Sequence, residues 1–131
     1  MTELPPPALV EHASPFDVAT TLQRLTAAIE AAGLTIFARI DHAEGARQAG
    51  LEMPPAVVLI YGHAKGGTPI MLSAPRVALD LPLRVLVRES QAGTVVSWHS
   101  MAPVLLAAGA PPALANRLDG AQNLLLKALQ P

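Results

Sequence analysis

The sequence predicts an α+β fold: a single domain, 1–131, with a mostly antiparallel five-stranded sheet and two main helices on one face. Five short apolar segments have the length of strands and are separated by breaks rich in glycine and proline. Two longer segments, one early and one late, repeat apolar residues at helical spacing. Because one helix cannot cover five strands, both long helices are expected on the same face.

The N-terminal part predicts a strand followed by a helix. Residues 1–7 form a proline-rich leader that we expect to be poorly ordered, and 8–13 form a short first strand. Ser14, Pro15 and Asp17 have the pattern of a helix start, with Ser14 as the N-cap and Pro15 at the first helical position. The inward face of this helix carries Val18, Leu22, Leu25 and Ile29.

A second strand is predicted over 34–40, after Gly33 ends the helix in a left-handed conformation. Strict alternation assigns its side chains to two faces: Leu34, Ile36, Ala38 and Ile40 on one, Thr35, Phe37 and Arg39 on the other. Asp41 and Glu44 then have capping-box spacing and predict a short helix that stops near Gly50.

The remaining strands follow from composition and turn residues. Residues 56–61 are apolar without alternation, which is typical of a strand covered on both faces. Residues 83–89 and 94–100 predict a hairpin around a four-residue loop with Gly93. A short helix ending at Gly109 and a long helix from Pro111 complete the chain, the latter with the stripe Leu114, Leu118, Ala121, Leu125 and Leu129.

Two helices on one face leave the other face of the sheet bare. We expect Phe37, Arg39, Arg84 and Leu86 on that bare face. The apolar run of the third strand indicates that the face is covered, and a second copy of the chain is the simplest cover. The sequence therefore predicts a homodimer through the open sheet face.

Composition excludes several classes of function. The net charge is −1 and the nine Lys and Arg residues are scattered, which disfavours nucleic acid and anionic membranes as partners. Without cysteine, the chain has no thiolate nucleophile and no sulfur ligand for a metal. No apolar run reaches the roughly 18 residues of a membrane span, and the N-terminus lacks a signal-peptide pattern, so a cytoplasmic location is expected.

The segment GHAKGGTP, 62–69, is the candidate binding site. Adjacent glycines let backbone N–H groups converge, and a lysine and a helix start at Thr68-Pro69 add positive charge, so a phosphate or carboxylate can bind there. The alternative is a plain turn in which Gly66 and Gly67 take positive φ and Lys65 is solvated. The order of residues is not that of a nucleotide P-loop, and no cofactor is expected. The candidate ligand-binding residues are Gly62, His63, Lys65, Gly66, Gly67 and Thr68.

Histidines supply the other candidates for chemistry. His42, His63 and His99 can converge on a metal or substrate, but none has metal-motif spacing, so no metal is expected. Asp41 is better explained as an N-cap than as an acid/base partner of His42. Asp80 can approach Lys65, and a small enzyme that uses His63, Lys65 and Asp80 as acid/base groups is one alternative function; a structural adaptor without ligand is another.

Three blocks of this sequence resemble a known family: GLTIFARIDHAEGARQAGLEMPP, YGHAKGGTPIM and ALDLPLRVLV. They are similar to the family called domain of unknown function 302, over about 8–100. Its usual Gly-Asn-Pro-Lys-x-Gly-Thr-Pro block stands here as 62–69, with His63 and Ala64 as departures. The resemblance implies a TBP-like α+β fold, soluble bacterial proteins that are often homodimers, and a site at Gly62, Lys65, Gly67, Thr68 and Pro69. It implies no established activity, and His63 argues against any role that needs an amide there.

Together these observations predict a small cytoplasmic, homodimeric binding or sensory module for a small anionic ligand at 62–69.

Overall fold

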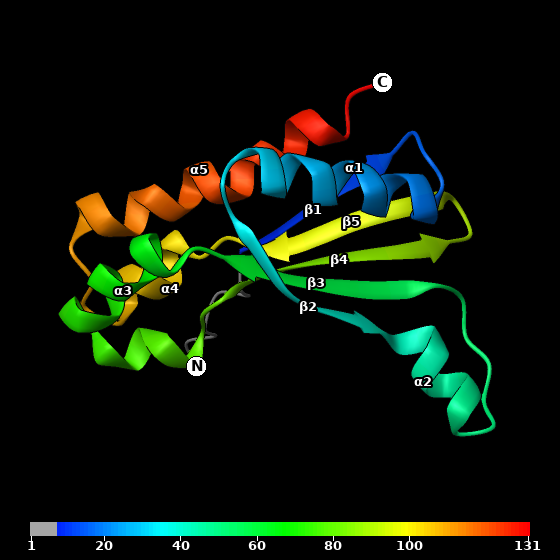
Figure 1. Cartoon of the computed structure of the whole chain (residues 1–131), viewed down its shortest axis with the longest axis horizontal. Helices are drawn as coiled ribbons and strands as arrows, with labels where there is room; N and C mark the ends of the chain where they lie inside the picture. Colours follow the sequence, from blue (N-terminus) through cyan, green and yellow to red (C-terminus); the bar gives the residue numbers. More distant parts are fainter. Residues whose placement is uncertain (1–7) are drawn as a thin grey trace, which may run out of the picture.

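The computed structural model describes residues 8–131 and confirms the predicted fold class (Figure 1). Five antiparallel strands form one open sheet in the order β1-β5-β4-β3-β2. The predicted leader, 1–7, lies outside the described residues. The elements in chain order are β1 (Leu9–Ser14), α1 (Val18–Ala31), β2 (Thr35–Asp41), α2 (His42–Gln48), β3 (Ala56–Gly62), α3 (Ala64–Ser73), the 3₁₀ helix η1 (Pro75–Leu79), β4 (Leu83–Ser90), β5 (Gly93–His99), α4 (Ala102–Ala107) and α5 (Pro112–Ala128).

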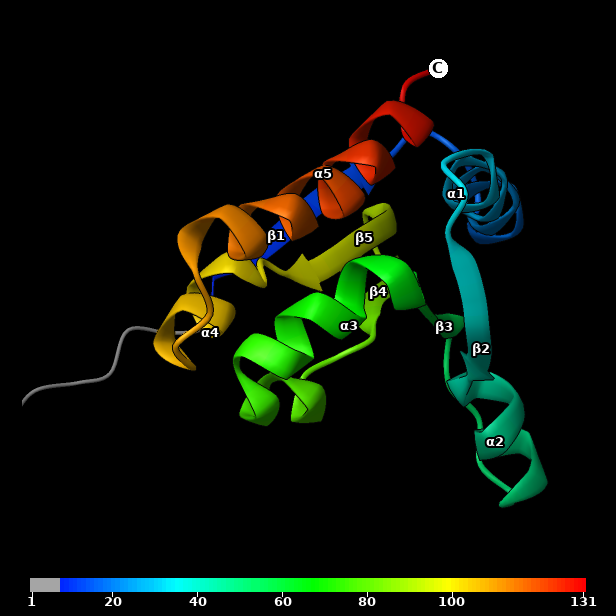
Figure 2. The same cartoon turned by 60° about the vertical axis from the view of Figure 1, so that its left-hand side comes forward.

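The two long helices α1 and α5 lie side by side along one face of the sheet (Figure 1). α3 and α4 gather at the end of the sheet where β3 finishes, whereas α2 lies at the opposite end (Figures 1 and 2). The core fills the space between the long helices and the sheet. It includes the predicted inward residues of α1 together with alternate residues of the central strands, among them Leu59, Tyr61, Val85, Val87 and Val96.

The start of α1 differs from the prediction. Ser14 ends β1, and the helix begins only at Val18 with Asp17 as its N-cap. The Asp17 carboxylate accepts a hydrogen bond of 2.7 Å from the Thr20 N–H, and this bond lowers the pKa of Asp17. Ser14 belongs to the strand because it pairs with Thr94 of β5, and its hydroxyl forms a 2.7 Å hydrogen bond with the Thr21 hydroxyl. The cap therefore falls three residues later than the capping-box spacing indicated.

The predicted stops and the short helix agree with the structure. Gly33, Gly50, Gly93 and Gly109 all have positive φ. Asp41 caps α2, because its carboxylate accepts the Glu44 N–H at 3.0 Å. The hairpin between β4 and β5 is tighter than predicted, since pairing extends to Ser90 and Gly93.

Arg24 joins the two long helices at their far end. Its guanidinium donates hydrogen bonds to the carbonyls of Ala128, at 2.8 Å, and Gln130, at 2.6 Å, and lies over the Phe16 ring, 4.3 Å from its centroid. The last carbonyls of a helix carry partial negative charge, so a cation there stabilises the end of α5. Among residues 8–131, no helix combines the length and hydropathy that a membrane crossing requires.

Candidate functional site

The predicted segment 62–69 lines a pocket of about 510 Å³, which we call the α3 pocket. This volume lies within the range typical of small-molecule sites, roughly 300–1,000 Å³. Its walls come from the α1–β2 turn, β2, the end of β3, α3, the segment that leads into β4, and the middle of α5. The lining residues are Ala32, Gly33, Leu34, Phe37, Gly62, His63, Ala64, Gly66, Gly67, Thr68, Met71, Leu81, Pro82, Leu83, Arg117, Leu118 and Ala121.

The segment is a helix start and not a loop. α3 begins at Ala64, five residues before Pro69, with His63 as an extended N-cap whose side chain makes no capping bond in the described structure. The N–H groups of Gly66 and Gly67 both donate to the His63 carbonyl, at 3.0 and 2.9 Å. Neither glycine has positive φ, so both the predicted turn and the predicted start at Thr68 are wrong.

The two α3 glycines instead give the pocket its room. A Cβ at Gly67 would meet Met71 and Leu81 at 3.8 and 3.9 Å, and one at Gly66 would meet nothing within 4 Å. Side chains at these positions would extend toward the opposite wall of the pocket. The glycines therefore leave unfilled space beside α3 that larger side chains would occupy.

A β-bulge places Phe37 on the pocket wall. The register of β2 shifts between Ile36, which pairs with Tyr61, and Ala38, which pairs with Ile60. Such bulges re-aim a side chain and are common beside functional sites. The predicted alternation through β2 is therefore wrong beyond Ile36.

The bulge also reassigns the side chains that follow it. Ala38 and Ile40 share the open face with their partners Ile60 and Val58, whereas Arg39 pairs with the buried Leu59 and belongs to the helix side. Arg39 is thus not part of the bare face, and Phe37 stands at the bulge, with its ring 3.6 Å from the position of a Cβ on Gly62.

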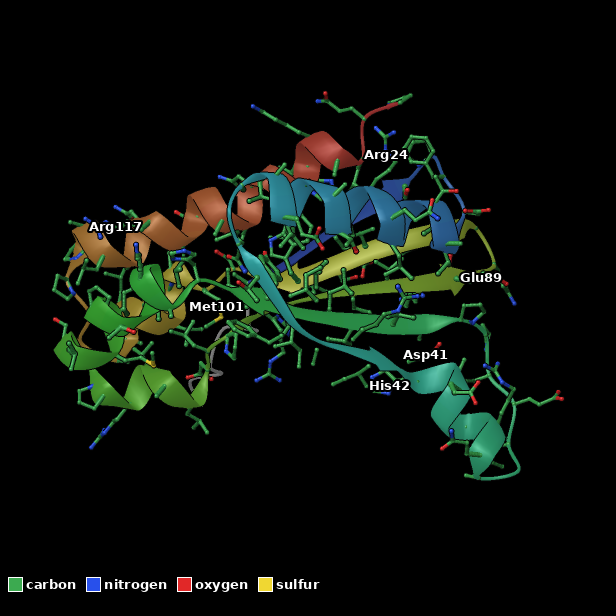
Figure 3. The ribbon with its side chains drawn as sticks, viewed as in Figure 1. Arg24, Asp41, His42, Glu89, Met101 and Arg117 are labelled. Atoms are coloured by element: carbon green, nitrogen blue, oxygen red, sulfur yellow. The ribbon has the colours of Figure 1, made fainter. Side chains whose placement is uncertain are left out.

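Arg117 is the only Lys, Arg, Asp or Glu among the described residues that line the α3 pocket. It projects from the part of α5 nearest α3 (Figure 3) and is exposed to solvent. Lys65 is exposed but does not line the pocket. Arg117 is 52 residues from the lysine that the sequence singled out, and only the packing of α5 brings it to the site.

A buried tyrosine fixes the wall formed by α5. Tyr61 of β3 is fully buried, and its hydroxyl donates a 3.0 Å hydrogen bond to the carbonyl of Ala121, a lining residue. Burial raises the pKa of Tyr61, because the phenolate would lose its hydration. One turn of α5 is thereby tied to the central sheet at the pocket.

A second hollow, the open-face groove, has a volume of about 400 Å³ and lies on the face of the sheet away from α1 and α5. As predicted, Arg84 and Leu86 lie there. The groove is lined by Leu9, Val58, Asp80, Pro82, Arg84, Leu86, Ser97, Trp98, His99, Met101 and Val104.

The candidate acid/base residues do not form one site. His63 lines the α3 pocket, Asp80 lines the open-face groove, and Lys65 lines neither. The ion pairs of the described chain join Arg47 to Glu44 and Arg88 to Glu11, so Asp80 and Lys65 are not paired. Within residues 8–131, no three His, Asp or Glu side chains gather as metal ligands do. This arrangement gives no support to the enzyme alternative.

The fold and site define a small α+β domain with a pocket at one end of an open antiparallel sheet. The chain belongs to the family described as "Domain of unknown function DUF302", whose model matches residues 10–130. A crystal structure of an uncharacterized conserved DUF302 protein from Bacillus stearothermophilus has the same fold, with a TM-score of 0.78 and 16% identity, over 92% of this chain and 94% of that one.

The chain is also similar to part of two longer proteins. The chain is 39% identical over 87 residues to proteins called "Fluoride-specific ion channel FluC 1" from Brucella suis biovar 1 (strain 1330) and Brucella abortus biovar 1 (strain 9-941). The match covers 66% of this chain but only 34% and 32% of those proteins. This chain therefore spans about a third of the length of the relatives.

Proposed function

We propose that the chain is a binding module whose α3 pocket takes a small molecule with an apolar body and one anionic group. The observation that carries this proposal is the pocket lining: apolar side chains and glycines with the polar His63 and Thr68, and Arg117 as the one Lys, Arg, Asp or Glu among the described residues. An apolar wall favours an apolar ligand through the water it releases, and a lone guanidinium at the rim favours a carboxylate, sulfonate or phosphate. Five of the six predicted site residues belong to this proposal, and Arg117 takes the place of Lys65.

The pocket is tested with a fluorescent apolar probe, the neutral N-phenylnaphthylamine. Gly67→Leu adds a side chain between Met71 and Leu81, and we expect it to weaken probe binding at least about tenfold. Gly120→Leu is the matched control, because Gly120 lies in α5, has open space around it and does not line the pocket. Equal probe affinity in the two variants, or no binding to the native chain, would count against the proposal.

The anionic group is tested by comparing this probe with anilinonaphthalene sulfonate, which has the same aromatic body and adds one sulfonate. A guanidinium contact at an exposed rim contributes about 1 kcal/mol, so the sulfonate should bind roughly fivefold more tightly. Arg117→Gln should abolish that preference, and Lys65→Gln should preserve it. If Lys65→Gln alone removed the preference, the anion would bind at the start of α3 as the sequence predicted.

We also propose that the module is a homodimer through the open sheet face. Five strands of about seven residues span roughly 24 by 24 Å, or ~570 Å² per copy. A pair would bury ~1,100 Å², just above the ~1,000 Å² expected of a biological interface. Native mass spectrometry at several concentrations tests this: Leu86→Glu, in the middle of the face, should give monomers, and Glu89→Gln, outside the groove, should not.

The names of the longer relatives favour a second role for this domain, that of a sensor attached to an ion channel. We propose that a ligand in the α3 pocket regulates the ion flux of a channel that carries this domain. The test uses the Brucella suis protein in vesicles, with and without the segment that matches this chain. Fluoride flux should respond to N-phenylnaphthylamine in the intact protein only; an equal response in both forms would exclude this role.

A further inference from the structure

One short segment separates the α3 pocket from the open-face groove. Leu81 and Leu83 line the pocket, Asp80 and Arg84 line the groove, and Pro82 lines both. These five consecutive residues therefore form a wall with one hollow on each side.

Only the second half of this wall belongs to the sheet. β4 begins at Leu83, which is 2% exposed and pairs with Tyr61. Before it, the Asp80 N–H donates to the Val77 carbonyl at 2.9 Å, and Leu81 and Pro82 connect this turn to the strand. Leu81 is half-buried and packs against the core, whereas Pro82 is exposed, so both residues still have surface that a ligand or a second copy can cover.

The groove carries charges that suit a second copy of the chain. Asp80 and Arg84 both line it, yet neither belongs to an ion pair of the described residues. In a two-fold symmetric dimer, every contact between two different residues occurs twice, once in each direction across the interface. Asp80 of one copy can therefore lie beside Arg84 of the other, in two equivalent pairs around the apolar floor of Val58 and Leu86.

We propose that ligand binding in the α3 pocket and dimerisation through the open-face groove strengthen each other, with 80–82 as the coupling element. This inference rests on the proposed function. The ligand packs against Leu81 from one side and the second copy packs against Pro82 and Asp80 from the other, so both stabilise the same conformation of one segment. Coupling between two sites is reciprocal and commonly five- to 150-fold, and we expect at least about fivefold here.

The experiment measures the dimer dissociation constant by sedimentation, with and without saturating N-phenylnaphthylamine. The neutral probe is used because it adds no charge to the system. We expect at least about fivefold tighter dimerisation with the probe, and the same factor in probe affinity between the native dimer and the Leu86→Glu monomer. An unchanged dissociation constant, with probe binding and dimerisation both observed, would overturn the coupling and leave the proposed function intact.

Two pocket variants show whether 80–82 carries the effect. Leu81→Ala removes the contact between ligand and wall, so the probe should bind more weakly and no longer affect the dimer. Met71→Ala removes a similar contact from α3, outside the wall, so the probe should also bind more weakly but retain the full coupling. Equal coupling in both variants would overturn the assignment to 80–82, and absence of probe binding or of a dimer in the native chain would overturn the proposed function as well.

Discussion

The α3 pocket and the open-face groove lie on opposite sides of one wall, yet they are built differently. The pocket is bordered by helices as well as strands, and four glycines contribute to its lining. The groove has a floor of strand residues and a rim with both signs of charge, from Asp80 and Arg84. A concave apolar hollow suits a small molecule, whereas a sheet face with a polar rim suits another protein surface.

The two hollows arise from the fold in different ways. The groove follows directly from the sheet, because any two-layer α+β fold leaves one sheet face uncovered. The pocket depends on local exceptions: a bulge at Phe37 and glycines inside α3. A site that needs such exceptions is a better candidate for function than a face that the architecture leaves open.

The largest effect is expected at Gln122, which ties the two regions together. It is 3% exposed; its side-chain amide donates to the His99 carbonyl at 2.8 Å and its oxygen accepts the Met101 N–H at 3.1 Å. His99 and Met101 line the groove, and the preceding turn of α5 lines the pocket. Gln122→Leu leaves both backbone groups without a partner and should lower the free energy of unfolding by about 2–4 kcal/mol.

Urea denaturation measures this loss, with Asn123→Leu as the control. Asn123 is exposed on the same helix, so its substitution should change the free energy of unfolding by no more than about 0.5 kcal/mol. Similar losses in the two variants would show that the glutamine bonds contribute little. The retained stability would then come from apolar packing of α5 alone.

A smaller effect is expected at the tyrosine that holds the pocket wall. Tyr61→Phe removes the hydrogen bond to the Ala121 carbonyl and should cost about 1 kcal/mol of unfolding free energy. The probe should bind more weakly to this variant, whereas dimerisation in the absence of probe should be unchanged, because Tyr61 faces the helices. A change in dimerisation alone would contradict this separation of the two regions.

Tyr61 also makes the free energy of unfolding depend on pH. Burial raises the pKa of Tyr61, so the folded state holds the phenol proton more tightly than the unfolded state does. The corresponding stability is present below the unfolded pKa, about 10, and is lost as the pH rises toward the folded value. Tyr61 is the only tyrosine, so phenolate absorbance reports it alone. The absorbance should appear only together with unfolding, and a titration near the ordinary pKa in the folded protein would contradict this.

The fold was predictable because its strands and long helices have the apolar spacing that their burial requires. The pocket was only half predictable. The segment 62–69 stands out by its glycines, but its proline suggested that the helix begins at Thr68-Pro69. In the structure Pro69 lies inside α3, directly before the fully buried Ile70. The bulge at Phe37 is invisible to alternation, because one extra residue exchanges the faces of a strand. Arg117 belongs to the site only through tertiary packing.

The smallest expected effect comes from adding a single methyl group inside or outside the α3 pocket. Gly67→Ala in α3 and Gly120→Ala in α5 both place alanine in a helix without a close contact: at Gly67 the new Cβ meets Met71 and Leu81 at 3.8 and 3.9 Å, and at Gly120 it meets nothing within 4 Å. Each should raise the free energy of unfolding by about 0.5–1 kcal/mol, because glycine loses more backbone entropy on folding.

Only Gly67→Ala should weaken the neutral probe, by about threefold, because its methyl group takes up pocket volume. The two variants thus match in stability and differ in binding. If both left binding unchanged, the space beside Gly67 would not be part of the site. If both weakened binding equally, the effect would come from the helices becoming more stable and not from the shape of the pocket.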